Sequence, residues 1–244
     1  MNTILQQLYR YLFCRGGHGV HSPFVFDLIT KVIEEKQAYY CYEPLYAIRQ
    51  QLQSDRSRIK TGEQELSLKR ALRRHCFSTN ECELLFRLCN YFQPVMIGAI
   101  GSGFGLVPLY LTAYSKSARC IVFESEPAIA QVARNVYKKA VNASIDMIEK
   151  TFHLHPGFQY DFMVWGRGVE ESFSLTVFEN LLPHITEKCV MVISGINDSS
   201  QAKQIWRTIC AHPRVTVTLD LYTLGIVCFH PQLNRRTYKC FISF

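Results

Sequence analysis

From residue 95 onward, short apolar runs alternate with longer segments in which apolar residues recur every three or four positions. The runs have the length of strands, and the longer segments, such as 128–139 and 174–182, have the spacing of amphipathic helices. Five runs are expected to be strands, namely 95–100, 120–123, 145–148, 162–165 and 190–193. Strands joined by helices of this length pair in parallel, so the pattern predicts an α/β fold with crossover helices.

The last part of the chain breaks this pattern. Two apolar runs, 215–221 and 225–229, are separated by only three residues. A parallel connection needs about a dozen residues or more. We therefore expect an antiparallel hairpin here, with 238–242 as a candidate for one further strand.

The first third of the chain has helical patterns. Apolar residues at helical spacing predict a helix within residues 1–13, where two glutamines and an arginine interrupt any continuous apolar core of a signal peptide. A second helix is predicted to begin at Ser22, which a proline follows. Another is predicted from Ser78, because Glu81 stands three residues later and completes the pattern of a capping box.

The composition fits one folded domain with an extension. The 244 residues are 48% apolar and 13% aromatic, which is enough for a sizeable core and excludes a disordered chain. We predict a helical extension over residues 1–78 and one α/β domain over residues 79–244. No apolar run approaches the roughly 18 residues that a membrane-spanning helix needs, so no membrane insertion is expected.

The ten cysteines are scattered along the chain from Cys14 to Cys240, and none belongs to a C-x-x-C pair. The nearest spacing, Cys76, Cys82 and Cys89, matches neither a zinc finger nor a redox motif. We interpret the cysteines as reduced and mostly buried thiols, as expected of a cytoplasmic protein.

The net charge of +7 is concentrated in one segment. Residues 49–74, the basic segment, contain eight Lys or Arg against three Asp or Glu, and thus contribute +5. The segment has no aromatic residues on which bases could stack. A solvated face is therefore favoured over a nucleic-acid surface, and RNA methylation is the less favoured alternative.

A glycine-rich turn follows the first run and is the most informative segment. It consists of Gly101, Ser102, Gly103, Phe104 and Gly105. Glycines between a strand and a helix let a ligand approach the backbone, and the helix N-terminus offers free N–H groups. Glu124, at the end of the second run, could accept hydrogen bonds from the hydroxyls of a ribose. Packing of the turn, and a solvated strand-end charge at Glu124, are the structural alternatives.

The spacing of these glycines bears on the kind of nucleotide. It is G-x-G-x-G, whereas a dinucleotide site expects G-x-G-x-x-G, so NAD is disfavoured. Together with a C-terminal antiparallel hairpin on a single α/β domain, the loop points to the architecture of S-adenosylmethionine-dependent methyltransferases.

Several stretches resemble a known family. They are His18-Gly-Val-His-Ser-Pro-Phe24, residues 84–94, the glycine turn with Glu124, and residues 212–221. They are similar to class I S-adenosylmethionine-dependent methyltransferases, in particular an O-methyltransferase-like group of Bacteroidetes. The resemblance covers nearly the whole chain. It implies a Rossmann-like sheet of seven strands with the last strand antiparallel, and a helical N-terminal extension over the cofactor end of the sheet.

The resemblance also implies site residues. The turn from Gly101 to Gly105 matches the cofactor loop, and Glu124 matches the acid that binds the ribose. Acidic residues expected elsewhere are missing, because Ala99, Gly166 and the pair Ser194-Gly195 stand at those positions and residues 149–152 offer no clear adenine partner. Carboxylates at the fourth and fifth strand ends would hold a divalent cation, so we predict no metal unless Asp198 supplies a ligand.

Methyl transfer without a metal needs alignment of donor and acceptor, with a general base for some acceptors. The weak candidates for that base are Asp198, His153 and His155, each of which is more often an ordinary surface residue. The expected activity is metal-independent methyl transfer to an unknown small-molecule or macromolecular acceptor. The alternative is a catalytically inactive protein that binds a macromolecular partner through its extension. A homodimer is left open.

The pair His18 and His21 is the last candidate cluster. It could bind a metal, but no third ligand stands nearby in the sequence. Hydrogen bonds to the backbone of the neighbouring glycine turn are the favoured interpretation.

Overall fold

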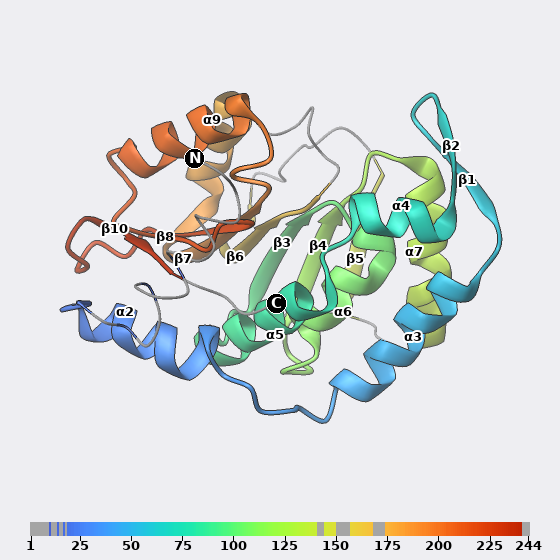
Figure 1. The fold of residues 1–244 in the computed structure, drawn as a ribbon, viewed down its shortest axis with the longest axis horizontal. Helices are drawn as coiled ribbons and strands as arrows, with labels where there is room; N and C mark the ends of the chain where they lie inside the picture. The colour runs from blue at the N-terminus through green and yellow to red at the C-terminus, as the bar shows by residue number, and fades with distance from the viewer. Residues whose placement is uncertain are drawn as a thin grey trace. The chain divides into compact units, whose positions relative to one another are not determined.

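The computed structural model describes residues 10, 14, 17, 19–140, 144–149, 157–167 and 174–240, which belong to two compact units (Figure 1). The larger unit comprises residues 38–189, and the smaller comprises residues 1–37 and 190–244. Of the helix predicted within residues 1–13, only Arg10 lies among the described residues, where it is helical. The boundary between residues 78 and 79 stays a prediction.

The larger unit contains four parallel strands in the order β6–β3–β4–β5. They are β3 (Met96–Ile100), β4 (Arg119–Phe123), β5 (Ile145–Ile148) and β6 (Tyr160–Trp165). The first four apolar runs of the sequence are thus strands, as predicted. From β3 the chain moves outward through β4 to β5 and then returns to the other side of β3, so the strand order reverses between β3 and β6. Ligands of open α/β sheets bind beyond the carboxyl ends of the strands at such a point.

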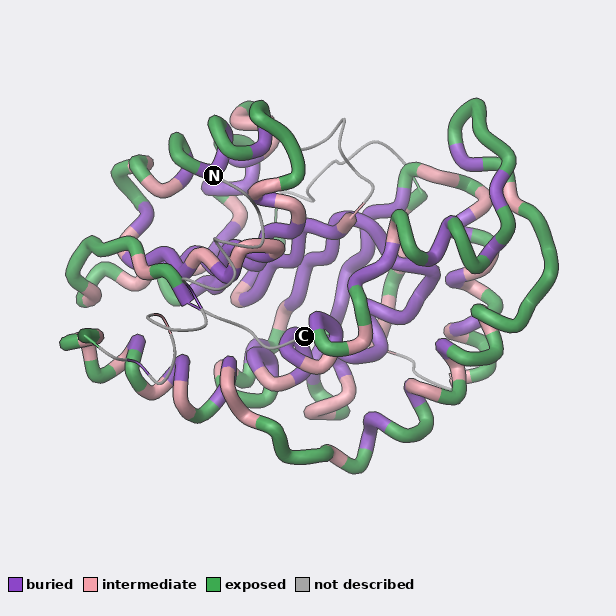
Figure 2. The backbone as a smooth tube through the Cα atoms, in the orientation of Figure 1, coloured by how far each residue is buried: buried purple, intermediate pink, exposed green. Residues whose placement is uncertain are grey.

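Helices of the larger unit cover these strands. They include α5 (Thr79–Phe92), α6 (Leu106–Thr112), α7 (Pro127–Ala140) and α8 (Leu175–Leu181), which the turn η4 (Leu182–His184) follows. Helix α6 packs against β3, β4 and α5, and all seven of its residues are buried. It is apolar on every side, which is typical of a helix enclosed by its neighbours. In Figure 2 the buried positions are concentrated in the strands and in the helices that touch them.

The basic segment forms regular structure that the sequence did not predict. It runs from α3 (Tyr42–Ser54) through a hairpin of β1 (Arg58–Thr61) and β2 (Gln64–Ser67) to α4 (Leu68–His75). Helix α3 packs against α4 and α6, and β1 packs against α7. Seven of the eight basic side chains are exposed, as expected for a solvated face. Arg49 corrects that expectation, because it is only 8% exposed.

The smaller unit has a mixed sheet. Its strands lie in the order β7–β9–β8–β10. They are β7 (Ile185–Ser194), of which residues 190–194 belong to this unit, β9 (Leu224–Cys228), β8 (Val217–Asp220) and β10 (Arg236–Lys239). Strand β9 is antiparallel to both β7 and β8, which confirms the predicted hairpin. Strand β10 pairs in parallel with β8, and among the described residues the strands from β3 to β10 number eight rather than the predicted seven. Its described helical elements include α2 (Pro23–Leu28), which continues into η1 (Ile29–Ile33), and α9 (Ser200–Ala211).

An N-terminal arginine is anchored to this sheet. Arg10 forms an ion pair with Asp220 at 2.9 Å and donates to the backbone oxygens of Asp220 and Cys240. Its guanidinium also lies 5.5 Å from the centre of the Tyr222 ring. Because Arg10 is buried, these contacts compensate a charge that would otherwise be costly to remove from water.

Local sequence signals explain two helix starts. The Ser22 side chain accepts from the Val25 N–H at the start of α2. Ser78 and Glu81 form the predicted capping box at the start of α5, and each accepts from the other's backbone. No helix within the described ranges is long and apolar enough to cross a membrane.

Candidate functional site

The glycine turn connects β3 to α6 through the short helix η2 (Gly103–Gly105) and is completely buried. Its backbone is left-handed at Gly101 (φ 86°), Gly103 (φ 52°) and Gly105 (φ 88°). Phe104 is also left-handed (φ 62°), although it is not a glycine. A bulky residue in this region carries strain, which persists only where its surroundings fix it, and Phe104 is fully enclosed.

Two of the glycines are needed for packing. A Cβ atom on Gly103 would lie 2.7 Å from Val107 Cγ2 and 3.2 Å from Cys76 Sγ. On Gly105 it would lie 3.2 Å from both the Cα and the carbonyl oxygen of Ala133 in α7. The packing interpretation therefore accounts for these two glycines.

Glu124 holds this turn. One carboxylate oxygen, Oε2, accepts from the Ser102 N–H at 2.9 Å and from the Ser102 hydroxyl at 2.7 Å. The other, Oε1, accepts from the Glu126 N–H at 3.1 Å. Glu124 is 3% exposed, so the interpretation as a solvated strand-end charge is wrong. The predicted loop and the predicted acid are in direct contact.

The carboxylate has little free capacity for a ligand. Two oxygens offer about four acceptor positions, and three donors already use them. A ribose that presents two hydroxyls would have to displace one of these donors. The Ser102 hydroxyl is the one that can rotate away without moving the backbone.

Tyr137 of α7 lies beside the turn. Its hydroxyl is buried and has no hydrogen-bond partner within the described part of the chain. Its ring lies 3.1 Å from the position that a Cβ on Gly105 would take. Burial raises the pKa of this phenol well above its usual value, and the charge of Glu124 adds to the shift. Such an orphaned polar atom is what a bound ligand with a polar group would satisfy.

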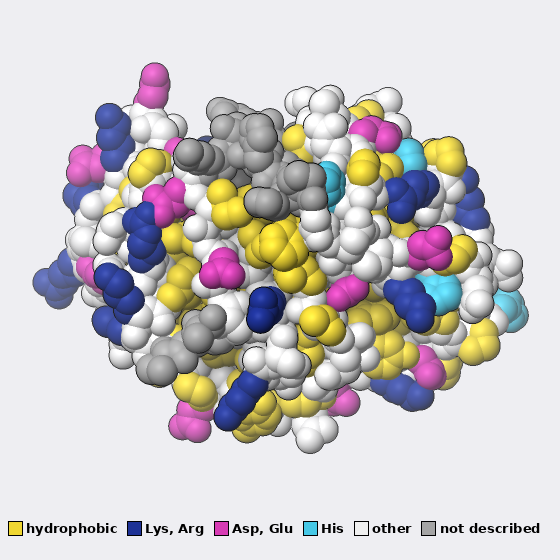
Figure 3. Space-filling model, turned by 180° about the vertical axis from the view of Figure 1, so that it is seen from behind, with side chains coloured by type: hydrophobic (Ala, Val, Ile, Leu, Met, Phe, Trp, Pro, Cys, Tyr) yellow, Lys and Arg dark blue, Asp and Glu magenta, His cyan; other side chains and the backbone are white. Residues whose placement is uncertain are grey.

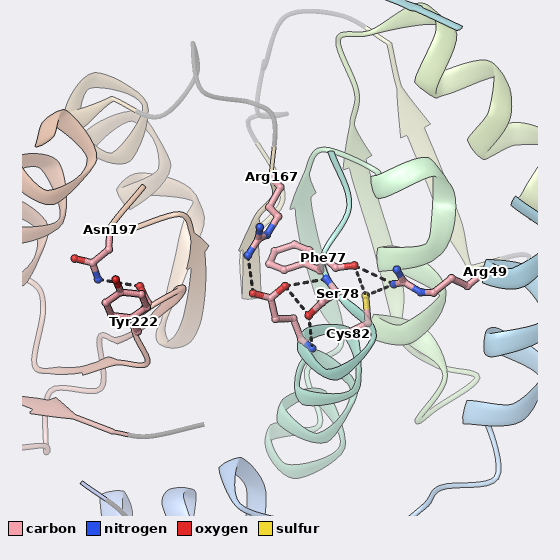
Figure 4. Close-up of polar contacts among 8 residues, drawn as sticks. Arg49, Phe77, Ser78, Cys82, Arg167, Asn197 and Tyr222 are labelled. Carbon is pink, nitrogen blue, oxygen red and sulfur yellow. Dashed lines mark hydrogen bonds and ion pairs between the residues drawn. The ribbon is translucent and has the colours of Figure 1, made fainter. Parts of the chain in front are cut away.

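The end of β6 lies against the same turn. The Gly166 N–H donates to the Ile100 carbonyl at 2.8 Å, and a Cβ on Gly166 would lie only 2.7 Å from that oxygen. The next residue, Arg167, forms an ion pair with Glu81 at 2.8 Å (Figure 4). The sequence indicated the missing carboxylate at Gly166 but not this ion pair, whose partners are 86 residues apart.

A second arginine lies buried behind the turn. Arg49 Nη2 donates to the Phe77 carbonyl at 3.0 Å and approaches Cys82 Sγ at 3.2 Å (Figure 4). It also approaches Cys76 Sγ at 3.8 Å. A hydrogen bond from the Cys82 thiol and the charge of Arg49 hold the pKa of Cys76 below its usual value, against burial. Burial raises the pKa of Cys82. None of the ten cysteines is in a disulfide, and eight are buried, as expected for reduced thiols.

The end of β7, in the smaller unit, carries another predicted residue. Asp198 is exposed, and its Oδ2 lies 2.8 Å from the position that a Cβ on Gly195 would take. The carboxylate thus occupies the space over Gly195 where the resemblance implies an acidic side chain. The neighbouring Asn197 donates to the Tyr222 carbonyl at 2.8 Å.

The remaining candidates fall outside this picture. His153, His155 and His18 lie outside the described residues, and His21 is exposed. Where side chains are described, no group of three or more His, Cys, Asp or Glu is placed to hold a metal ion. The expectation of a metal-free site stays a prediction, as do the catalytic candidates.

Comparison with known proteins finds likeness in structure alone. No protein family profile matches the chain. No curated protein matches it in sequence.

Several solved methyltransferases have a similar structure. The O-methyltransferase TomG from Streptomyces achromogenes, solved with S-adenosylmethionine, is 13% identical, with a TM-score of 0.55 over 84% of this chain and 94% of that one. The O-methyltransferase from Bacillus cereus, solved with S-adenosylhomocysteine, is 15% identical, with a TM-score of 0.54 over 84% and 97%. The methyltransferase PaMTH1 from Podospora anserina, also bound to S-adenosylhomocysteine, is 12% identical, with a TM-score of 0.54 over 80% and 99%. The chain therefore has the Rossmann-like α/β fold that these methyltransferases share.

Proposed function

We propose that this chain is an S-adenosylmethionine-dependent methyltransferase-like protein that binds its cofactor at the glycine turn and Glu124. The observation that carries the proposal is the contact between Glu124 and Ser102, which joins the predicted loop and the predicted acid at the carboxyl ends of β3 and β4. Its support is the fold, which is shared with methyltransferases solved with S-adenosylmethionine or S-adenosylhomocysteine.

The residues of this site fit a nucleoside-containing cofactor. Glu124 would accept from the ribose hydroxyls once the Ser102 hydroxyl turns away, and the buried Tyr137 hydroxyl would gain a partner. The cofactor supplies an electrophilic methyl group on a sulfonium. The chain's own task is to bind and orient it, because methyl transfer depends mainly on the alignment of donor and acceptor.

We further propose that transfer proceeds without a metal. At Gly166 the absence of a side chain is required by the 2.7 Å approach to Ile100, so this strand end has no room for a carboxylate ligand. Asp198, His153 and His155 stay the candidates for a general base, and the acceptor is unknown. The loss of acidic motifs, the relation to the Bacteroidetes group, the cytoplasmic location and a homodimer stay proposals.

A nucleic-acid acceptor is less well supported. On the face shown in Figure 3, Lys and Arg side chains are interspersed with Asp and Glu side chains, which does not resemble a continuous phosphate-binding surface. The inactive binding protein is the other alternative, and it is not favoured. If purified protein transferred labelled methyl groups from S-adenosylmethionine to components of a bacterial small-molecule extract, that alternative would be excluded.

Calorimetric titration with S-adenosylhomocysteine tests cofactor binding. Glu124→Gln should weaken affinity at least ~10-fold, because a charged acceptor of ribose hydrogen bonds is lost. Ser102→Ala should not weaken it, because the variant removes the hydroxyl that competes for Oε2. The matched control is Glu187→Gln, on an exposed glutamate of β7, which should bind like the wild type.

Two results would contradict the proposal. One is the absence of any heat of binding at ~1 mM ligand with the wild-type protein, which corresponds to less than about 4 kcal/mol of binding free energy. The other is equal weakening by Ser102→Ala and Glu124→Gln, which would mean that Glu124 only orders the loop.

A further inference from the structure

Arg167 is placed at the point of the sheet where a ligand is expected. It follows β6, the neighbour of β3 across the reversal of strand order. The residue before it touches the glycine turn, since a Cβ on Gly166 would lie 3.5 Å from the Gly101 carbonyl oxygen. The guanidinium thus stands beside the carboxyl ends of the two central strands, where open α/β sheets bind ligands.

The orientation of the Arg167 side chain is fixed by Glu81. Glu81 is 2% exposed, and its Oε1 accepts from Arg167 Nη2 at 2.8 Å. Its other oxygen, Oε2, accepts from the N–H and the hydroxyl of Ser78 at 2.8 and 2.9 Å. Because the capping box holds Glu81 in place, Glu81 in turn holds the guanidinium (Figure 4).

Most of the donors of Arg167 have no acceptor among the described residues. A guanidinium has five N–H groups, and among the described residues only Nη2 has a hydrogen-bond acceptor. The Nε atom is buried and has no acceptor in the part of the chain that the structure describes. Buried donors of charged groups in native proteins almost always have a partner, and where protein supplies none it is a water, an ion or a ligand. The side chain is 27% exposed, so it is accessible from one side.

The local charge favours an anion. Glu81 neutralises Arg167, and the N-terminus of the 14-residue helix α5 adds roughly half a positive charge beside the pair. Two positions of β3 and of the β6 end for which the resemblance implies acids are occupied by Ala99 and Gly166. Glu124 already accepts from three donors.

We propose that Arg167 is the anion-binding residue of this site and takes a carboxylate or phosphate group of the bound molecules. The planar guanidinium presents several parallel donors, which match the two oxygens of such a group. The inference rests on the proposed cofactor binding, and it assigns a specificity-determining role to a residue for which the resemblance implies none. The anionic group belongs either to the amino-acid part of the cofactor or to the methyl acceptor.

The test compares two adenosine ligands and a free anion. S-adenosylhomocysteine carries a carboxylate, and 5′-methylthioadenosine shares its thioadenosine part but lacks the amino-acid part. Both are titrated calorimetrically into the wild type and into Arg167→Gln, Arg167→Lys and the control Arg70→Gln, whose arginine is exposed on α4. Inorganic phosphate is titrated into the same proteins, with and without saturating S-adenosylhomocysteine.

If the cofactor supplies the anion, Arg167→Gln weakens S-adenosylhomocysteine about 10- to 100-fold and leaves 5′-methylthioadenosine unchanged. If the acceptor supplies it, both adenosine ligands bind as in the wild type, and phosphate binding weakens at least ~10-fold. In either case the affinity of Arg167→Lys lies between those of the wild type and Arg167→Gln, because lysine keeps the charge but not the planar arrangement of donors. The unchanged affinity for 5′-methylthioadenosine shows that the variant is folded.

The inference is overturned if Arg167→Gln binds all three ligands like the wild type. It is also overturned if the variant weakens both adenosine ligands by the same factor, because Arg167 would then only support the fold. Failure of the proposed function looks different, since the wild type would bind neither adenosine ligand. The phosphate titration without cofactor would still decide whether Arg167 binds an anion.

Discussion

Removal of the buried charge at Arg49 should destabilise the larger unit strongly. Arg49→Met keeps an apolar stem of similar length and removes only the guanidinium. The Phe77 carbonyl then loses its donor at 3.0 Å, and Cys76 and Cys82 lose the positive charge beside their sulfur atoms. Because the partners stay buried, the change leaves polar groups unsatisfied.

The size of the effect follows from these contacts. One hydrogen bond from a charged donor to a buried carbonyl contributes about 1.5–3 kcal/mol, and the contacts to the sulfur atoms add less. The folded wild type also bears the desolvation penalty of the buried Arg49 cation, whose Nε has no acceptor among the described residues. The variant no longer has this penalty, which offsets part of the loss. We expect the free energy of unfolding to fall by about 2–3 kcal/mol.

Urea unfolding followed by circular dichroism measures this change. Arg56→Met is the matched control, because Arg56 belongs to the same basic segment and is exposed. It should cost no more than about 0.5 kcal/mol. A difference between the two variants below about 0.5 kcal/mol would refute the reasoning, since Arg49 would then behave as a solvated side chain.

Three further predictions concern stability. Burial raises the pKa of Cys41 to about 11 and that of Cys228 and Cys240 to about 12 from 9.0, so the unfolded chain loses thiol protons first. In the presence of reductant, the free energy of unfolding should therefore fall as the pH rises above about 9, and it should fall less steeply in Cys228→Ala. If urea titrations gave the same free energy of unfolding at every pH, this burial would be contradicted. Ser78→Ala should cost about 1 kcal/mol in the same assay, because the capping box of α5 is lost, and an unchanged midpoint would show that the cap is not needed. Gly166→Asp should destabilise the chain by more than about 1 kcal/mol without creating a Mg²⁺ site, because its Cβ would lie 2.7 Å from the Ile100 oxygen. Binding of Mg²⁺ to the variant in calorimetry would show that the end of β6 has room for a carboxylate ligand.

Local and periodic features of this chain were predictable from its sequence. The capping box needs only Ser78 and Glu81 three residues apart, and the structure contains it. The runs of β3, β4 and β6 were recognisable because strands buried on both faces are continuously apolar. The contact of the glycine turn with Glu124 was also within reach, because the carboxyl ends of adjacent parallel strands lie at one edge of a sheet.

Features that depend on distant partners were not predictable. The hairpin β1–β2 has four-residue strands that are mostly exposed, and it packs on α7, more than 60 residues away in the chain. Each of its short strands has a single aliphatic residue, which is too few to establish the alternation that identifies a half-buried strand. Arg49 looked like one more charge of a basic segment, because its partners lie 27 to 33 residues further along the chain. Its burial follows from how α3 packs, which charge patterning does not reveal.

The same contacts that made the glycine turn recognisable also limit what it can bind. Glu124 stabilises the turn by accepting from Ser102, so a ligand that needs this carboxylate competes with the loop's own hydrogen bonds. The backbone bond from the Ser102 N–H can stay in place while the hydroxyl rotates, because hydroxyl hydrogens are free to turn. Ligand binding then costs one hydroxyl contact, about 1 kcal/mol, rather than the order of the loop. Ser102 is therefore the residue whose removal distinguishes a binding role of Glu124 from a purely structural one.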